Sequence, residues 1–245
     1  MNEWENDGCG VVGSDFGQLF QSEQDSELER IDIGGVVFEM ESTSRDNKHV
    51  NGRTGLMLWE GSSCMANIIM LCPLSFKNRS TIELGSGACP LPSFVASYHG
   101  AAAVVTDGSP DVLDRATGNF RRNRHLTSGE VVMVPLVWGD PDGIELVLRH
   151  AESGFDWVLG ADVLYSEEGV DKFFFTAKSL LQRKSTARLL VCYMVRGVGE
   201  DRIMKSALSS GLYRSALSDE ISSAACKLNI EEHSSLRLAM FRPTT

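Results

Sequence analysis

Short apolar runs alternate along most of the chain with segments whose apolar residues recur at helical spacing. The runs of strand length lie at residues 81–84, 103–106, 131–134, 156–160 and 188–193. Several of these runs are apolar almost throughout, which is typical of strands buried on both faces of a sheet. The pattern therefore predicts a mostly parallel sheet with helices on both sides.

Two flanking regions complete the predicted domain. Residues 31–43 hold a Gly-Gly pair between two β-prone runs, which predicts a hairpin. The stretch after Leu212 and residues 236–241 predict a further pair of strands. The expected fold is a three-layer, doubly wound α/β domain with a seven-stranded, Rossmann-like sheet. Ligands are expected at the carboxyl ends of its central strands.

Helix starts carry weaker local signals. Residues 54–72 contain an apolar segment that predicts a helix, and Ser62 or Ser63 is available as its N-cap. A second start is predicted at Ser109, because Pro110 suits the first helical position.

The acidic residues are concentrated near the start of the sequence. The chain has 245 residues and a net charge of −10, and residues 1–50 hold 12 Asp and Glu against three Lys and Arg. Residues 1–29 carry eight acidic residues and no Lys or Arg, so they bury too little apolar surface to offset their ordering entropy. We expect residues 1–29 to be a disordered tail and residues 30–245 to form one domain.

Composition also limits the compartment and the partners. The sequence has no run of about 18 apolar residues and no basic, apolar leader. We therefore expect a cytoplasmic protein with no membrane partner, with the nucleus as an alternative location. We also expect the protein to be monomeric. An acidic chain is a poor general ligand for nucleic acid, whose phosphates require Lys and Arg. The cysteines and histidines show no metal-binding spacing, so no metal is expected.

The sharpest chemical signal is T-I-E-L-G-S-G, in which a predicted strand runs into Gly85 and Gly87. Glycines at this point let the backbone turn sharply and approach a ligand closely. Asp107 follows at the end of the next strand, where a carboxylate can accept hydrogen bonds from ribose hydroxyls. Together these residues predict a site for a cofactor that contains a nucleoside.

Missing features indicate which cofactor it is. The dinucleotide fingerprint requires a third glycine three residues after the second, where this chain has Pro90. The phosphate-binding pattern G-x-x-x-x-G-K-[ST] is absent as well. S-adenosylmethionine has a ribose and an amino acid but no phosphate, and it suits E-x-G-x-G better than NAD or a nucleoside triphosphate does.

Four motifs together resemble methyltransferase family 16, a group of class I, seven-β-strand protein-lysine methyltransferases. They are G-L-M-L-W-E-G-S-S-C-M-A, E-L-G-S-G, V-T-D-G-S-P-D-V-L-D-R-A-T-G-N-F-R-R-N and F-D-W-V-L-G-A-D-V-L-Y, and the resemblance covers residues 31–242. It implies S-adenosylmethionine as cofactor, S-adenosylhomocysteine as product, and transfer of methyl groups to a lysine of a protein partner.

The resemblance also implies a place for each site residue. The implied cofactor contacts are Trp59 beside the cofactor, Glu83, Gly85 and Gly87 around its methionine part, Asp107 on the ribose, Trp138 beside the adenine, and Ala161 after the fourth core strand. Asp162 and Tyr165 match the family's Asp-x-x-Tyr pair at the methyl-transfer mouth. Because a carboxylate alone raises a lysine's pKa, we expect Asp162 to orient the amine or the adjacent loop rather than act as a simple base.

One departure from the family pattern concerns Cys89, which stands where the family usually has a third glycine. Its side chain either crowds the cofactor's carboxylate end or packs under the next helix.

Two other functions stay open from the sequence. A nucleic-acid methyltransferase would resemble [DNS]-P-P-[YF] after the fourth strand, where this chain has A-D-V-L-Y. A catalytically inactive protein-binding module on the same scaffold would bind no cofactor.

Overall fold

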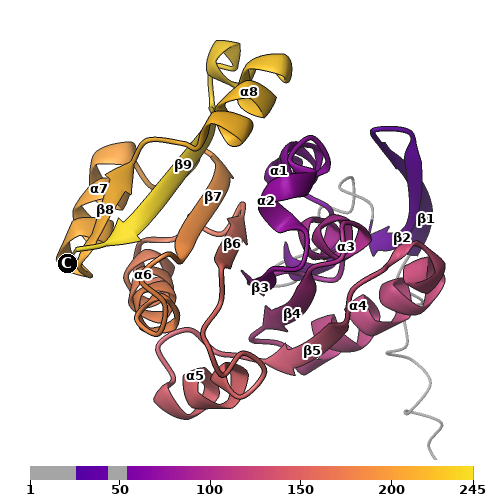
Figure 1. Cartoon of the computed structure of the whole chain (residues 1–245), viewed down its shortest axis with the longest axis horizontal. Coiled ribbons are helices and arrows are strands. Elements are labelled where there is room, and N and C mark those ends of the chain that lie inside the picture. The colour runs from indigo at the N-terminus through magenta and orange to yellow at the C-terminus, as the bar shows by residue number, and fades with distance from the viewer. Residues whose placement is uncertain (1–25, 44–53, 245) are drawn as a thin grey trace, which may run out of the picture.

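The computed structural model describes residues 26–43 and 54–244, and strands and helices alternate through most of them (Figure 1). The described residues form a two-stranded hairpin and a seven-stranded sheet. The strands of the sheet are β3 (Ser80–Leu84), β4 (Ala102–Asp107), β5 (Val131–Pro135), β6 (Trp157–Ala161), β7 (Arg188–Met194), β8 (Leu212–Ser215) and β9 (Leu236–Pro243).

The strand order is β5-β4-β3-β6-β7-β9-β8. The five strands from β3 to β7 are parallel, whereas β9 runs antiparallel to both β7 and β8. The order reverses between β3 and β6, so the carboxyl ends of these two strands diverge into a crevice. The predicted α/β fold with a mostly parallel sheet is therefore confirmed.

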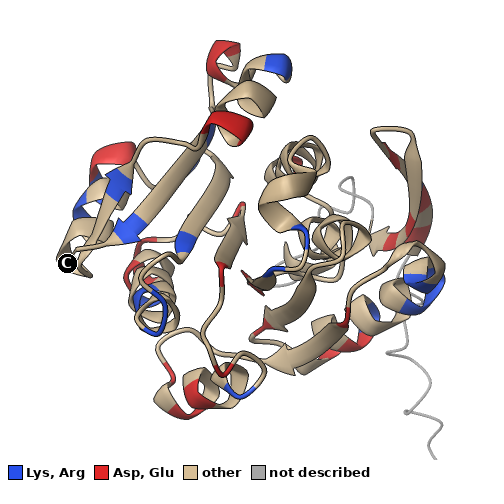
Figure 2. Ribbon diagram, in the orientation of Figure 1, with Lys and Arg blue, Asp and Glu red and all other residues tan. Residues whose placement is uncertain are grey.

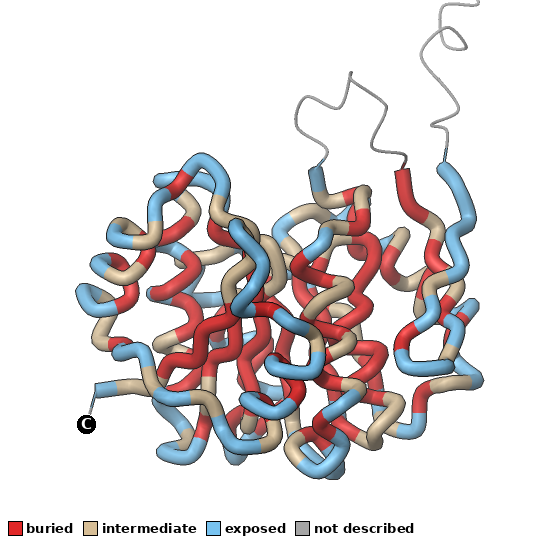
Figure 3. The backbone as a smooth tube through the Cα atoms, turned by 90° about the horizontal axis from the view of Figure 1, so that it is seen from above, coloured by how far each residue is buried: buried red, intermediate tan, exposed pale blue. Residues whose placement is uncertain are grey.

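Helices cover both faces of the sheet. One apolar core lies between the sheet and α1 (Glu60–Met70), α3 (Leu91–Tyr98), α8 (Asp219–Lys227) and the hairpin. A second core lies on the opposite face, against α5 (Pro141–Leu148), α6 (Glu167–Leu181) and α7 (Glu200–Ser209). Figure 3 shows the buried backbone concentrated in the central strands, while Figure 2 shows charged residues mainly on the helices and the hairpin. The remaining helical elements are η1 (Thr54–Leu56), α2 (Pro73–Phe76), α4 (Pro110–Asn123), η2 (Arg124–Leu126) and η3 (Ile230–Glu232).

The hairpin consists of β1 (Ser26–Ile33) and β2 (Val36–Thr43), joined by Gly34 and Gly35. Both glycines have positive φ angles, 61° and 87°, which they adopt without strain. β1 begins at Ser26, four residues before residue 30, at which we expected the domain to start. The other residues of the predicted tail lie outside the described part of the chain.

Two asparagines of α4 hold the hairpin in place. Asn119 Oδ1 accepts from Glu41 N at 2.7 Å, and Asn119 Nδ2 donates to Glu41 O at 3.0 Å. Asn123 makes the same pair of bonds with Glu39 N and O, at 2.9 and 2.7 Å. The two amides thus pair with β2 as a neighbouring strand would. They fix the hairpin to α4, the helix that follows β4.

The start of α1 differs from the expectation. The helix begins at Glu60, and neither Ser62 nor Ser63 caps it, so the predicted serine cap is wrong. Asp162, which lies 101 residues further along the chain, accepts a hydrogen bond from Gly61 N at 2.6 Å instead. Ser109 does precede α4 as predicted, but its hydroxyl makes no capping bond.

Candidate active site

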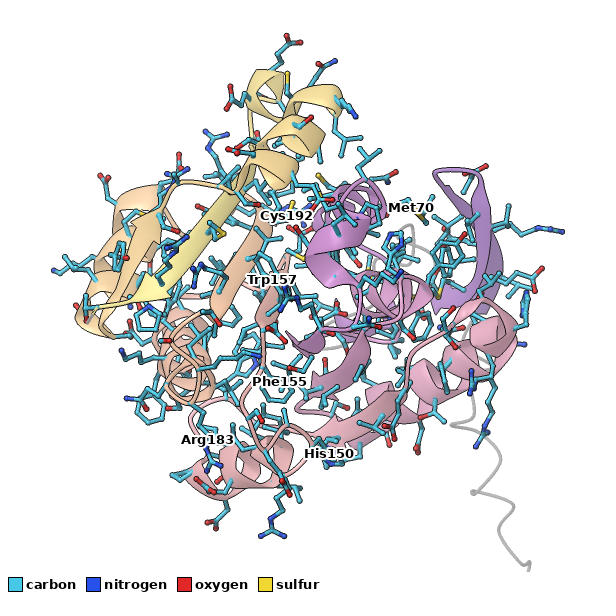
Figure 4. All side chains as sticks on the ribbon, in the orientation of Figure 1. Met70, His150, Phe155, Trp157, Arg183 and Cys192 are labelled. Atoms are coloured by element: carbon cyan, nitrogen blue, oxygen red, sulfur yellow. The ribbon has the colours of Figure 1, made fainter. Side chains whose placement is uncertain are left out.

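A cleft of about 900 Å³ opens at the carboxyl ends of the central parallel strands. This is the edge at which a doubly wound sheet binds its ligands. The structure brings all the residues predicted from the sequence to this cleft: Trp59, Glu83, Gly85, Gly87, Asp107, Trp138, Ala161, Asp162 and Tyr165. Trp157, which is labelled in Figure 4, does not line the cleft. It packs on Phe76 and donates to Ser75 O at 2.9 Å.

The floor of the cleft is the turn after β3. Gly85 and Gly87 have φ angles of 68° and 64°, a region that disfavours residues with a side chain. A Cβ at Gly85 would lie 2.7 Å from the ring of Trp138, and one at Gly87 would lie 2.9 Å from Gly55 O. The turn therefore requires glycine at both positions, for its backbone conformation and for space.

Asp107 ties the end of β4 to this turn. Its carboxylate accepts from Gly87 N at 3.1 Å and from Ser109 N at 3.0 Å. Partial burial raises the pKa of the Asp107 carboxyl, although the backbone hydrogen bonds oppose that shift. Each carboxylate oxygen has a second lone pair. Asp107 can therefore hold the turn and still accept from a ligand hydroxyl.

Glu83 is a carboxylate in the interior, with only 1% of its surface exposed. Its Oε2 accepts from Ser93 N at 3.0 Å and from Ser93 Oγ at 2.5 Å, while the residue lines the cleft. Burial raises the pKa of Glu83 to about 7. A buried carboxyl that is near its titration point at neutral pH suits a cationic group better than a neutral one.

Trp59 and Trp138 both line the cleft, and both are half-buried. Trp138 covers Gly85 and packs edge-on against Phe173, with ring centroids 5.3 Å apart. Trp59 donates from Nε1 to Thr54 O at 2.9 Å. The guanidinium of Arg196 lies 4.8 Å from the centre of the Trp59 ring. Both flat rings are held by specific contacts, so they can serve as walls for a planar ligand.

Arg196 is a cleft residue that the sequence reasoning missed. It follows β7, stacks on Trp59 and pairs with Glu60 at 2.7 Å. Its position directly after an apolar strand could have identified it as a site residue, because the parallel strands β6 and β7 end at the same edge of the sheet. Arg115 and Met194 also line the cleft without having been predicted.

Asp162 joins three elements around the cleft. Its Oδ2 accepts from Gly61 N at 2.6 Å, its Oδ1 accepts from Met194 N at 2.8 Å, and its own backbone N–H donates to Cys192 O at 2.8 Å. Its φ angle of 53° is unusual for a residue with a side chain. Tyr165, three residues on, is 53% exposed at the mouth. The carboxylate thus faces backbone amides, and the tyrosine faces outward.

Cys89 is buried beside the hairpin and α4, and it also lines the cleft. The side chain is 2% exposed, and its Sγ lies 3.7 Å from Glu41 O and 3.9 Å from Asn119 Nδ2. Burial raises the pKa of the Cys89 thiol to about 12, so the thiolate needed for reactivity does not form near neutral pH. The side chain is part of the contact between the hairpin, α3 and α4.

The described residues show neither a metal site nor a membrane segment. No cluster of three or more His, Cys, Asp or Glu side chains among them could hold a metal ion. None of the described helices has the length and apolar character that a membrane crossing requires.

The fold is that of class I S-adenosylmethionine-dependent methyltransferases. A putative methyltransferase from Streptococcus mutans aligns with a TM-score of 0.58 and 14% identity, over 88% of this chain and 55% of that chain. The 16S rRNA N2 G1207 methyltransferase of T. thermophilus, solved with AdoMet and guanosine, aligns with a TM-score of 0.55 and 11% identity, over 90% of this chain and 51% of that one. At such identities the likeness establishes the fold alone.

Within that class, the chain belongs to the lysine methyltransferase family, whose model matches residues 40–210. It is 29% identical over 140 residues to the protein-lysine N-methyltransferase EFM3 of Chaetomium thermophilum, which covers 56% of this chain and 42% of that protein. It is 27% identical over 170 residues to the calmodulin-lysine N-methyltransferase of Arabidopsis thaliana, which covers 68% and 54% respectively. The chain spans about half the length of the curated relatives that it matches.

Proposed function

We propose that this protein is an S-adenosylmethionine-dependent protein-lysine N-methyltransferase. One observation carries the proposal: in a chain of the lysine methyltransferase family, the glycine turn after β3 is bonded to Asp107 at the cleft edge of the sheet. That juxtaposition is the one expected for a cofactor with a ribose, and the sequence lacks the patterns that bind phosphate groups.

The residues of the cleft fit such a cofactor. The flat ring of Trp138 suits the adenine, and that of Trp59 would lie beside the cofactor. Asp107 can accept from ribose hydroxyls, and Glu83 offers a buried carboxylate to an ammonium group. Ala161 lies at the end of β6, beside Asp162, where a larger side chain would reduce the space in the cleft. S-adenosylmethionine, when bound there, supplies an activated methyl group.

The chain's own residues then serve mainly to position the reactants and exclude water, which is what a direct displacement requires. Tyr165, Val137 and Met194 line the cleft near its mouth, and the first two are more than half exposed. We propose that they form the channel through which the acceptor side chain enters.

The acceptor lysine must lose a proton before its nitrogen can attack. With an unperturbed pKa near 10.4, that loss costs about 4.6 kcal/mol at pH 7. Desolvation against Tyr165 and Met194 lowers the pKa of an inserted amine and so reduces the cost. Asp162 joins the start of α1 and the end of β7 to the end of β6 through Gly61 N and Met194 N, so we assign it a positioning role there.

The test is to incubate the purified protein with methyl-labelled S-adenosylmethionine and a cell extract, and to treat parallel samples with protease and ribonuclease. We expect the label in protein, where protease digestion releases it. Label released only by ribonuclease would mean that the acceptor is RNA. A protein that neither binds the cofactor in calorimetry nor transfers label would be a binding module on this scaffold.

A further inference from the structure

Ser62 carries a buried hydroxyl that finds no hydrogen-bond partner in the part of the chain that the structure describes. It lies in the first turn of α1, and the residue is 7% exposed. Its Oγ is enclosed and has no hydrogen-bond partner among the described residues, although the residue lines the cleft. Buried polar side chains nearly always have a partner. An unpaired hydroxyl at the wall of a cleft therefore indicates a ligand group that would complete it.

The surroundings of Ser62 favour an acceptor that carries negative charge. The start of an α-helix has the positive end of the helix dipole. The nearby backbone donors are already engaged, since Gly61 N donates to Asp162 and Ser62 N donates to Trp59 O at 3.1 Å. The hydroxyl of Ser62 is thus left as an enclosed donor without a partner among the described residues, on a residue that lines the cleft near the positive end of the helix dipole.

Glu83 supplies the opposite chemistry in the same cleft. A carboxylate only accepts hydrogen bonds, whereas a serine hydroxyl can donate. An α-amino acid group, with an ammonium and a carboxylate on one carbon, needs one partner of each kind. Glu83 suits the ammonium and Ser62 suits the carboxylate.

We propose that Ser62 Oγ donates a hydrogen bond to the carboxylate of the methionine part of S-adenosylmethionine. The inference rests on the proposed function and extends it to a contact made by this chain's own serine. Because the bond is charge-assisted, it adds affinity for ligands that contain the amino acid group and none for ligands that lack it.

Calorimetry with two ligands tests the assignment. S-adenosylhomocysteine contains the amino acid group, whereas 5′-methylthioadenosine retains the adenosine and the thioether but lacks that group. Each would be titrated into the wild type, Ser62→Ala and the matched control Ser63→Ala. Ser63 is the next residue of the same helix, and its side chain does not line the cleft.

Ser62→Ala should weaken S-adenosylhomocysteine binding by about 10-fold or more while changing 5′-methylthioadenosine binding by less than about twofold. Ser63→Ala should leave both affinities unchanged. The melting temperature of ligand-free Ser62→Ala should equal or exceed that of the wild type, because the substitution removes a buried hydroxyl that has no partner.

Two results would overturn the inference. An unchanged affinity of Ser62→Ala for S-adenosylhomocysteine would remove the hydroxyl from the carboxylate site. Equal losses for both ligands would show that Ser62 acts through the shape of the cleft. A wild-type protein that binds neither ligand would instead refute the proposed function, so the two failures are distinguishable.

Discussion

The carboxylate of Asp162 and the backbone N–H of Gly61 form a hydrogen bond of 2.6 Å that joins the end of β6 to the start of α1. A Cβ added to Gly61 would lie 2.8 Å from Asp162 Cγ and 2.9 Å from Cys192 O, so the contact requires glycine. The other carboxylate oxygen holds Met194 at the end of β7. One side chain thus sets the spacing of three elements that line the cleft.

Asp162→Ala should therefore impair turnover through lost positioning. Loss of alignment alone can slow a reaction about 100-fold. We expect a drop of that order in methyl transfer to extract proteins, a melting temperature lower by several degrees, and a smaller loss of cofactor affinity than Asp107→Ala causes. Asp162→Asn retains one acceptor oxygen, so its turnover and its melting temperature should lie between those of the wild type and those of Asp162→Ala. Equal labelling of the same bands by wild type and Asp162→Ala would remove Asp162 from any role in transfer.

Asp107→Ala should weaken cofactor binding in a protein that remains folded. Loss of a charge-assisted hydrogen bond costs about 1.5 to 3 kcal/mol, and the Gly87 amide would also lose its acceptor. Calorimetry with S-adenosylhomocysteine measures the effect. Asp114→Ala is the matched control, because Asp114 is exposed on the same α4 and does not line the cleft. Unchanged affinity in the Asp107 variant would exclude the residue from the ribose site.

Glu83 predicts a pH dependence of stability. Burial raises the pKa of Glu83 from an ordinary 4.5 to about 7, so the folded protein binds the proton more tightly than the unfolded chain does. The stability that Glu83 contributes is complete below pH 4.5 and is lost as pH rises to about 7, by about 3 kcal/mol at most. Relative to Glu83→Gln, the ligand-free wild type should become less stable between pH 5 and pH 8. Denaturant titrations giving a constant difference across that range would contradict the raised pKa.

Arg196→Ala should loosen the wall formed by Trp59. The substitution removes both the stacking at 4.8 Å and the ion pair with Glu60. Since exposed cation–π contacts contribute about 0.5 to 1 kcal/mol, we expect a twofold to fivefold loss of cofactor affinity. Arg196→Lys keeps the charge but lacks the planar stacking group and should recover only part of the loss. A variant with full affinity would show that Arg196 does not support the ring.

The first strand gives a prediction about truncation. Deleting residues 1–25 should leave the melting temperature and the cofactor affinity nearly unchanged, because their acidic composition offers little to bury. Deleting residues 1–29 instead removes half of β1, including Glu29, which accepts a hydrogen bond from Ser42. That truncation should melt several degrees lower. If the two truncated proteins have the same melting temperature, the first half of β1 contributes nothing to the stability of the domain.

Most of the fold could be predicted because its signals are local. The core strands are apolar runs, and each run needs only a few residues to be recognised. The Gly34–Gly35 turn is visible in the same way. The start of β1 was missed because its first five residues are all exposed, so they show no apolar alternation and resemble a tail by composition.

Long-range contacts explain what could not be predicted. The cap of α1 comes from Asp162, and no window of sequence around Glu60 contains it. The packing of Cys89 depends on the hairpin and α4, neither of which is adjacent to it in sequence. The sequence motifs identified residues that line one cleft. Only the folded chain shows that both oxygens of Asp162 accept hydrogen bonds and that Ser62 Oγ has no partner among the described residues.

If this cleft transfers methyl groups to lysine, the methylated product residue can be identified directly. Extract proteins would be labelled from methyl-labelled S-adenosylmethionine with wild type and with Asp107→Ala, hydrolysed to amino acids, and separated by chromatography. We predict that the label elutes as N-methylated lysine with the wild type and is strongly reduced with the variant. Label recovered in another amino acid or only in nucleic acid, or equal labelling by both proteins, would contradict the proposed function.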